Sequence, residues 1–259
     1  MALSPAELSE LKTAKDLLEN PGLAARVSTL VGTPVELALK KLPSSFHGTI
    51  HTATQTAIEK ALDVAVLTMK QDKQEPSSNL LHKLAAGASG AAGGFWGLTA
   101  LPFELPLSTT IMLRSIADIA RSEGEDLRQT DVRLECLQVL ALGGASKSDD
   151  IAEAGYFAAR AALAKAVSEA VEHLAKHGLT QQGAPAIVRL ISQIAARFSI
   201  IVSEKVAAQA VPVVGALGGA AINTLFINHY QDMGRGHFMV RRLERLHGPE
   251  EIRQLYTGL

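Results

Sequence analysis

Residues 84–120, LAAGASGAAGGFWGLTALPFELPLSTTIMLRSIADIA, decide how this chain can fold. The stretch carries no charged side chain between Lys83 and Glu104, yet glycine recurs through it. A helix that is uncharged on all sides belongs in a protein core or in a membrane. Three interpretations therefore compete: a phosphate-binding loop, a membrane span and a buried helix.

The glycine spacing excludes a phosphate-binding loop. Gly87, Gly90 and Gly93 recur every third residue, which matches neither a dinucleotide-binding fingerprint nor a loop that ends in Gly-Lys-Ser/Thr. No strand-like pattern precedes them, so the context that such a loop requires is missing as well.

The length of two uncharged runs is compatible with membrane-spanning helices, but their composition is not. Residues 84–103 and 206–228 are both uncharged and long enough to cross a bilayer, and small residues at such spacings let membrane helices approach one another. Both runs are rich in alanine and glycine, however, and would insert weakly. Pro102 and Pro106 interrupt the first run and Pro212 the second, so we do not expect stable spans.

The third interpretation is a pair of buried helices in a bundle. Each interior glycine destabilises a helix by about 0.5–1 kcal/mol relative to alanine, so close packing or a ligand must offset that cost. The helices could pack backbone to backbone or leave a groove for an apolar ligand, and these two possibilities do not exclude each other. The residues predicted to line such a groove are Gly87, Gly90, Gly94, Trp96, Glu104, Arg114 and Asn223.

The rest of the chain also predicts helices. Ser4-Pro5-Ala6-Glu7 has the pattern of a capping box with proline at the first helical position. No stretch alternates apolar and polar residues as a half-buried strand does. We expect helices near 5–19, 23–31, 34–42, 48–70, 108–122, 131–143, 146–178 and 184–210. A basic helix and a short terminal helix should follow at the end of the chain. The predicted fold is all-α, a multi-helix bundle around two glycine-rich, uncharged buried helices.

One polar segment divides the chain. Residues 71–79, QDKQEPSSN, are polar and broken by proline, as linkers are. We expect residues 1–75 to form helices that pack on a main body of residues 76–259, the two parts making one continuous domain.

Composition excludes several classes of function. The net charge of −1 offers no overall field for nucleic acid. The single Cys136 rules out an internal disulfide and a multi-cysteine metal site. His47 and His51 are four residues apart, but no carboxylate stands where a zinc helix motif needs one, so we predict no metal and no cofactor. The first twenty residues lack the pattern of a secretory signal, which predicts a cytoplasmic protein.

Glu104 is the polar residue most suggestive of a site, because it lies between Pro102 and Pro106 among apolar neighbours. A carboxylate there must cap a helix, pair with a cation or shift its pKa. In a structural role it would accept amide hydrogens near Ser108 or pair with Arg114. In a catalytic role it would act as acid or base, with Arg114 orienting it or binding an anion.

A second candidate surface lies near the end of the chain. Residues 234–248, GRGHFMVRRLERLHG, form a basic and amphipathic pattern that is typical of membrane-surface helices. The residues predicted to meet the membrane are Arg235, Phe238, Arg241 and Arg242. The alternative is an ordinary outer helix whose arginines pair in part with Glu244.

Two separated parts of the chain resemble the EcsC family of bacterial proteins. The first is the glycine-rich run followed by Leu-Pro-x-Glu-Leu-Pro and Met-Leu-Arg-Ser-Ile, and the second is Val-Pro-x-x-Gly with a Phe-x-x-Arg-x-Leu-Glu ending. Together they cover roughly residues 80–248. The resemblance implies an association with the membrane or with secretion and supplies no catalytic residues.

These observations predict a helical protein that associates peripherally with the inner face of the cytoplasmic membrane or binds lipid or another apolar ligand, with no defined reaction. Its expected partners are the membrane surface or lipid, with a transporter or secretion component as a further possibility. The alternatives are an enzyme that acts on an apolar substrate through Glu104 and Arg114, and a plain protein-interaction module.

Overall fold

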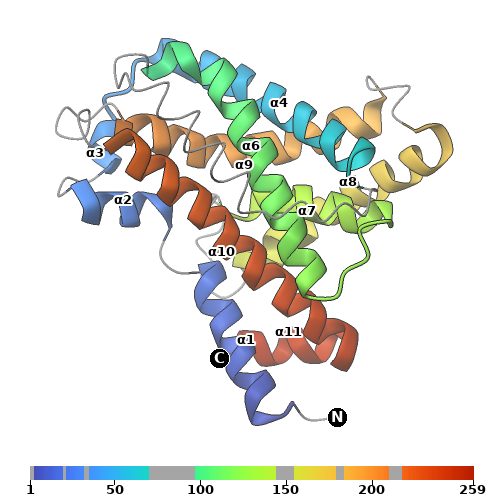
Figure 1. Cartoon of the computed structure of the whole chain (residues 1–259). Coiled ribbons are helices and arrows are strands. Elements are labelled where there is room, and N and C mark those ends of the chain that lie inside the picture. The colour runs from blue at the N-terminus through green and yellow to red at the C-terminus, as the bar shows by residue number, and fades with distance from the viewer. Residues whose placement is uncertain are drawn as a thin grey trace.

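The protein is helical throughout the part that its computed structural model describes (Figure 1). The described residues are 3–19, 22–31, 35–69, 97–143, 155–178, 184–209 and 218–259. No strand occurs among them, which confirms the all-α prediction. Their ten helices are α1 (Pro5–Glu19), α2 (Leu23–Val31), α3 (Val35–Leu39), α4 (Ser44–Leu67), α6 (Gly97–Ser122), α7 (Thr130–Leu142), α8 (Gly155–His177), α9 (Pro185–Gln209), α10 (Gly218–His247) and α11 (Pro249–Gly258).

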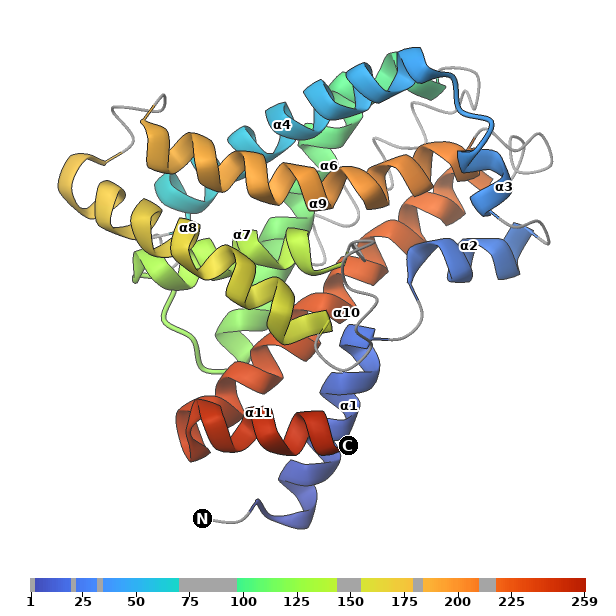
Figure 2. The same cartoon turned by 180° about the vertical axis from the view of Figure 1, so that it is seen from behind.

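Helix α10 is 30 residues long and runs diagonally through the molecule (Figure 2). Helix α6 packs along it, and α1 and α11 pack against it as well. Helix α4 lies against both α6 and α9, while α8 packs on α7 and α9. The bundle is therefore organised around α6, α9 and α10.

The helices before and after the predicted linker share one core. A single cluster of buried apolar side chains extends from Leu23 in α2 to Phe238 in α10 and includes residues of α4, α6, α7, α8 and α9. A smaller cluster joins α1, α8, α10 and α11 around Leu11, Tyr156 and Ile252. Residues 71–79 themselves lie outside the described residues.

The capping box at the start of α1 is present as predicted. The Ser4 amide donates to Glu7 Oε2 at 2.8 Å, and the Glu7 amide donates back to Ser4 Oγ at 3.3 Å. These two bonds satisfy amide hydrogens that the first turn of a helix otherwise leaves unpaired.

Helix α6 begins earlier than the sequence predicts. We expected Pro102 and Pro106 to separate a helix in the glycine-rich run from a second helix near 108–122, but α6 begins at Gly97 and passes through both prolines. A proline inside a helix removes the hydrogen bond to the carbonyl four residues before it, and its ring crowds that carbonyl. Leu101 and Leu105, both buried, anchor this part of the helix in the core. Burial of that apolar face outweighs the two missing hydrogen bonds.

Helix α10 also differs from the prediction. We expected a helix over 184–210, then an uncharged glycine-bearing helix and a separate basic helix. Helix α9 ends at Gln209, close to the predicted end, whereas α10 runs without a break from Gly218 to His247 and joins the uncharged and the basic parts. Residues 84–96 and 210–217, which belong to the two predicted glycine-rich helices, lie outside the described residues.

Gly236 allows α1 to cross α10 closely. A Cβ atom at this position would lie 2.6 Å from Leu18 Cγ and 2.9 Å from the Ala14 carbonyl oxygen. At Gly234 the nearest atom would be Ile116 Cγ1 at 3.4 Å, which is an ordinary contact. The two glycines therefore have different roles, although they are two residues apart.

The contrast gives a stability prediction. Gly236→Ala should lower the free energy of unfolding by about 2 kcal/mol, because α1 must move to relieve the overlap. Gly234→Ala should be neutral or raise it by up to about 1 kcal/mol, because alanine favours a helix. Chemical denaturation of both variants measures the difference, and equal effects would contradict this account of α1 packing.

Candidate functional site

Four helices meet at one end of the molecule. Helices α4 and α6 begin there and pack against each other, and α9 ends close to the start of α10 (Figure 1, upper left; Figure 2, upper right). Helices α6 and α10 thus both begin at this end. Each of them begins inside one of the two uncharged runs of the sequence.

An ion pair between Glu104 of α6 and Lys205 of α9 lies at this end. Lys205 Nζ is 2.6 Å from Glu104 Oε1 and 4.8 Å from the centroid of the Phe226 ring. The Lys205 side chain is fully buried, whereas that of Glu104 is 37% exposed. A buried ammonium group is very unfavourable without a partner, so Glu104 and the Phe226 ring together make the burial of Lys205 possible.

The predicted pair of Glu104 and Arg114 does not form. Both residues belong to the continuous helix α6, and ten residues of helix separate their backbones by about 15 Å. Arg114 is exposed, and Asp118 accepts a hydrogen bond from Arg121 at 2.7 Å. The catalytic hypothesis therefore loses its orienting arginine, and Glu104 is paired with a lysine from another helix.

Two large apolar side chains project into solvent near the start of α6. Phe103 is 82% exposed and Leu107 is 59% exposed. Residues four apart lie on the same face of a helix, so the two side chains form one apolar stripe. Glu104 is the one acidic residue in the sequence from 97 to 117, and it is paired with Lys205.

The neighbouring corner between α3 and α4 is basic. Lys40 and Lys41 lie in the turn between these helices, and His47 and His51 follow on α4; all four are exposed. No aspartate or glutamate occurs in the sequence from 37 to 58. The α4/α6 surface, defined by Lys40, Lys41, His47, His51, Phe103 and Leu107, is therefore apolar along α6 and basic along α4.

The basic part of α10 is arranged differently from the prediction. Phe238 is fully buried in the core. Arg241 pairs with Glu125 at 2.8 Å and with Glu135 at 3.2 Å. Phe238 cannot contact lipid while the protein is folded, so the packing does not support the predicted membrane-surface role of this helix.

The other arginines of that prediction are also paired. Arg242 bonds Glu123 at 2.7 Å and Glu10 at 3.0 Å, and Arg235 bonds Asp232 at 2.9 Å. The contacts of Arg242 connect α10 to α1 and to the residue that follows α6, whereas the Arg235–Asp232 pair lies within α10.

A network of buried, hydrogen-bonded side chains lies around His237. Its Nε2 is 3.2 Å from Glu135 Oε2, and its Nδ1 is 2.9 Å from the Tyr156 hydroxyl. Because a carboxylate only accepts, Nε2 carries the proton and Nδ1 of the neutral ring accepts from Tyr156. Arg160 donates to the Tyr156 oxygen at 3.3 Å and to Glu244 at 2.7 Å.

The protonation states of the side chains in this hydrogen-bond network are set by neighbouring groups. Burial lowers the pKa of His237 and keeps the ring neutral. Burial opposes ionisation of Glu135, yet the hydrogen bond from His237 and the charge of Arg241 hold its pKa below its usual range. Every side chain in the network has a hydrogen-bond partner, so the network is a structural connection between α7, α8 and α10.

Asn223 and the histidines complete the predicted site residues. The Asn223 Oδ1 atom is buried and has no hydrogen-bond partner within the described part of the chain. His47 and His51 are exposed, and no group of three potential metal ligands occurs among the described residues. Gly87, Gly90, Gly94 and Trp96 lie outside them.

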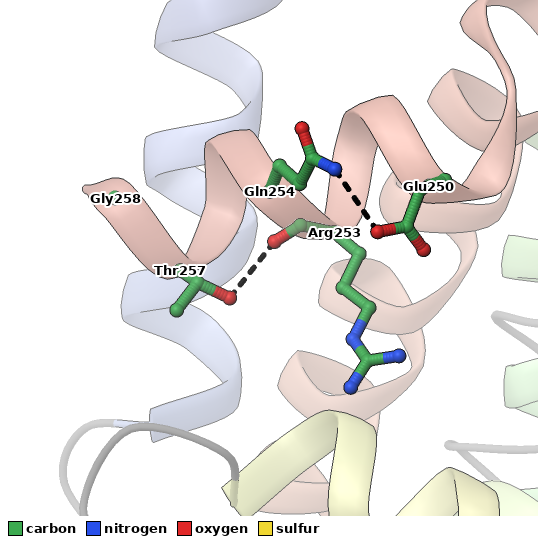
Figure 3. A pocket seen from close by; sticks show the side chains of 5 residues that line it. All are labelled: Glu250, Arg253, Gln254, Thr257 and Gly258. Atoms are coloured by element: carbon green, nitrogen blue, oxygen red, sulfur yellow. Dashed lines mark hydrogen bonds between the residues drawn. The ribbon is translucent and has the colours of Figure 1, made fainter.

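A hollow on α11 does not form a site. It is lined by Glu250, Arg253, Gln254, Thr257 and Gly258, all from this one helix (Figure 3). Gln254 donates to Glu250, and the Thr257 hydroxyl donates to the Arg253 carbonyl oxygen. These bonds run along the helix surface and leave no converging polar groups.

One described helix, α9, is long and apolar enough to cross a membrane by length and composition. The core helix of a soluble protein meets the same criterion. Helix α9 packs against α4, α7 and α8 and carries the paired Lys205, and 44% of its apolar window is buried.

Comparison with known proteins identifies the family. The model of the EcsC protein family matches residues 6–243. The match includes the amino-terminal helices, which the resemblance seen in residues 80–248 did not cover. Searches of the curated proteins and of the solved structures found no match. This chain of 259 residues belongs to the EcsC protein family.

Proposed function

We propose that this protein is a peripheral membrane protein that docks through its α4/α6 surface, where the apolar stripe of α6 enters the lipid. The observation that carries the proposal is Phe103, a large aromatic side chain that is 82% exposed. Full burial of such a side chain contributes about 1.5–3 kcal/mol. A membrane would cover it together with Leu107.

The surroundings of Phe103 support lipid as the occupant. Its neighbour Glu104 is neutralised by Lys205, so no unpaired carboxylate of α6 between residues 97 and 117 would repel lipid phosphates. Residues 84–96, immediately before α6 in the sequence, carry no charge. An apolar helix face beside basic residues is the pattern of helices that lie in the membrane interface.

Vesicle flotation tests the proposal. The wild-type protein should float with phospholipid vesicles, and the double variant Phe103→Ser, Leu107→Ser should lose at least tenfold in vesicle affinity. Both side chains are exposed, so the variant should unfold at the same denaturant concentration as the wild type.

Leu246→Ser is the matched control. Leu246 is 63% exposed and lies near the opposite end of α10. This variant should float like the wild type. Equal flotation of the Phe103/Leu107 variant and the wild type would overturn the docking surface.

A further inference from the structure

We infer that the membrane partner of the α4/α6 surface is anionic, and that Lys40 and Lys41 contact its lipid phosphates. The inference rests on the proposed function, because it names the lipid class for the same surface. It is carried by the two adjacent lysines at the α3–α4 corner, both of which are exposed.

Most basic side chains of the described residues are already neutralised. Arg26, Arg160 and Arg241 pair with Asp232, Glu244 and Glu125. Such groups cannot bind lipid phosphates without leaving a carboxylate unpaired. The basic groups on which membrane binding depends must therefore lie elsewhere.

Lys40 and Lys41 meet this requirement. Both are exposed, and within the described part of the chain no carboxylate forms a salt bridge with either. The sequence from 37 to 58 contains no acidic residue, and Glu36 and Glu59 flank this stretch. His47 and His51 lie at the same corner. Lys40 and Lys41 are thus two adjacent exposed ammonium groups just before α4, whereas other exposed basic residues without an ion pair among the described residues, such as Lys12, Lys60 and Arg114, stand singly elsewhere.

The two lysines lie at the same end of the molecule as the apolar stripe of α6. They directly precede α4, and α4 packs along α6, which carries Phe103 and Leu107 near its own start. Both helices begin at the same end of the molecule (Figures 1 and 2). A membrane that covers Phe103 would therefore lie close to the lysines, within the range over which surface charge acts.

The expected effect is large enough to measure. A lysine close to an anionic membrane strengthens binding by about fivefold. Lys40→Gln with Lys41→Gln should therefore weaken binding to vesicles that contain phosphatidylglycerol by about 25-fold. Binding of the wild type should also fall as salt rises, because the interaction is screened.

The control is Lys12→Gln with Lys60→Gln, which removes the same charge from two exposed lysines of α1 and of the far part of α4. Co-sedimentation should compare these variants on vesicles of phosphatidylcholine alone and of phosphatidylcholine with phosphatidylglycerol. The control should bind like the wild type, and the wild type should prefer the anionic vesicles.

The outcomes separate the inference from the proposed function. Equal binding of the wild type to both kinds of vesicle would overturn the anionic partner, and equal loss in the Lys40/Lys41 and control variants would overturn the contact through these lysines. Either result would leave membrane docking intact. Absence of wild-type binding to either kind of vesicle would overturn both.

Discussion

Glu104→Gln should lower the free energy of unfolding by about 3 kcal/mol. Lys205 is fully buried, and removal of one partner from a buried ion pair costs about 3–5 kcal/mol because the remaining charge has no compensation. We expect the lower end of that range, since Glu104 is partly exposed and water can reach this region. Urea denaturation monitored by circular dichroism measures the change.

The effect should be asymmetric between the partners. Lys205→Met replaces the buried ammonium with an apolar side chain of similar length beside Phe226, and it leaves Glu104 in contact with water. It should therefore cost less than Glu104→Gln, and the double variant should be more stable than Glu104→Gln alone. A Glu104→Gln variant as stable as the wild type would show that Lys205 does not need its carboxylate.

Acid should destabilise the fold through His229. Burial and the positive charge of Arg26 lower the pKa of His229 to about 4, well below the 6.5 of a free histidine. The folded state therefore favours the neutral ring, so stability is complete above pH 6.5 and is lost as pH falls from 6.5 to 4. About 2.5 pKa units correspond to about 3 kcal/mol.

The geometry explains why a charged ring is unfavourable there. Nε2 of His229 lies 3.3 Å from the Gly143 carbonyl oxygen and donates to it, whereas Nδ1 is buried with no partner among the described residues. Protonation would place an unpaired N–H group at Nδ1.

His229→Gln keeps a donor for Gly143 and does not titrate. Its stability should fall less steeply between pH 6.5 and pH 4 than that of the wild type. Neutral His237 should contribute acid sensitivity in the same direction in both proteins, because burial also lowers its pKa. Parallel stability curves for the variant and the wild type, measured by denaturation at each pH, would contradict the assignment to His229.

Much of the fold could be predicted from sequence because its signals are local. The capping box at Ser4 and Glu7 fixes the start of α1, and apolar spacing gives most helix bounds to within a few residues. Helix α6 was misjudged because the effect of Pro102 and Pro106 depends on tertiary packing. Leu101 and Leu105 hold the helix in the core, and no local rule weighs that burial against two lost hydrogen bonds.

The candidate site was less accessible to sequence reasoning. Glu104 stood out through its apolar surroundings, but Lys205 lies 101 residues further along the chain, and no spacing relates the two. The basic pattern around Arg241 was visible, whereas its carboxylate partners Glu125 and Glu135 come from a turn and another helix. Composition shows that charges are present, and only the fold shows which of them are already paired.

The exposed stripe could have been found only in part. Phe103 and Leu107 have the same apolar character and helical spacing as the buried Leu101 and Leu105, so the sequence cannot tell which pair faces solvent. The fold decides this, because the side of α6 that carries Leu101 and Leu105 is buried in the core, whereas Phe103 and Leu107 remain exposed among the described residues.

The single tryptophan tests the central claim most directly. Trp96 immediately precedes α6 in the sequence, so its fluorescence should report what the start of α6 encounters. The account predicts that anionic vesicles containing brominated lipid quench the Trp96 emission of the wild type, and that Phe103→Ser with Leu107→Ser abolishes the quenching. Unchanged emission of the wild type at saturating vesicle concentration would contradict docking through the α4/α6 surface.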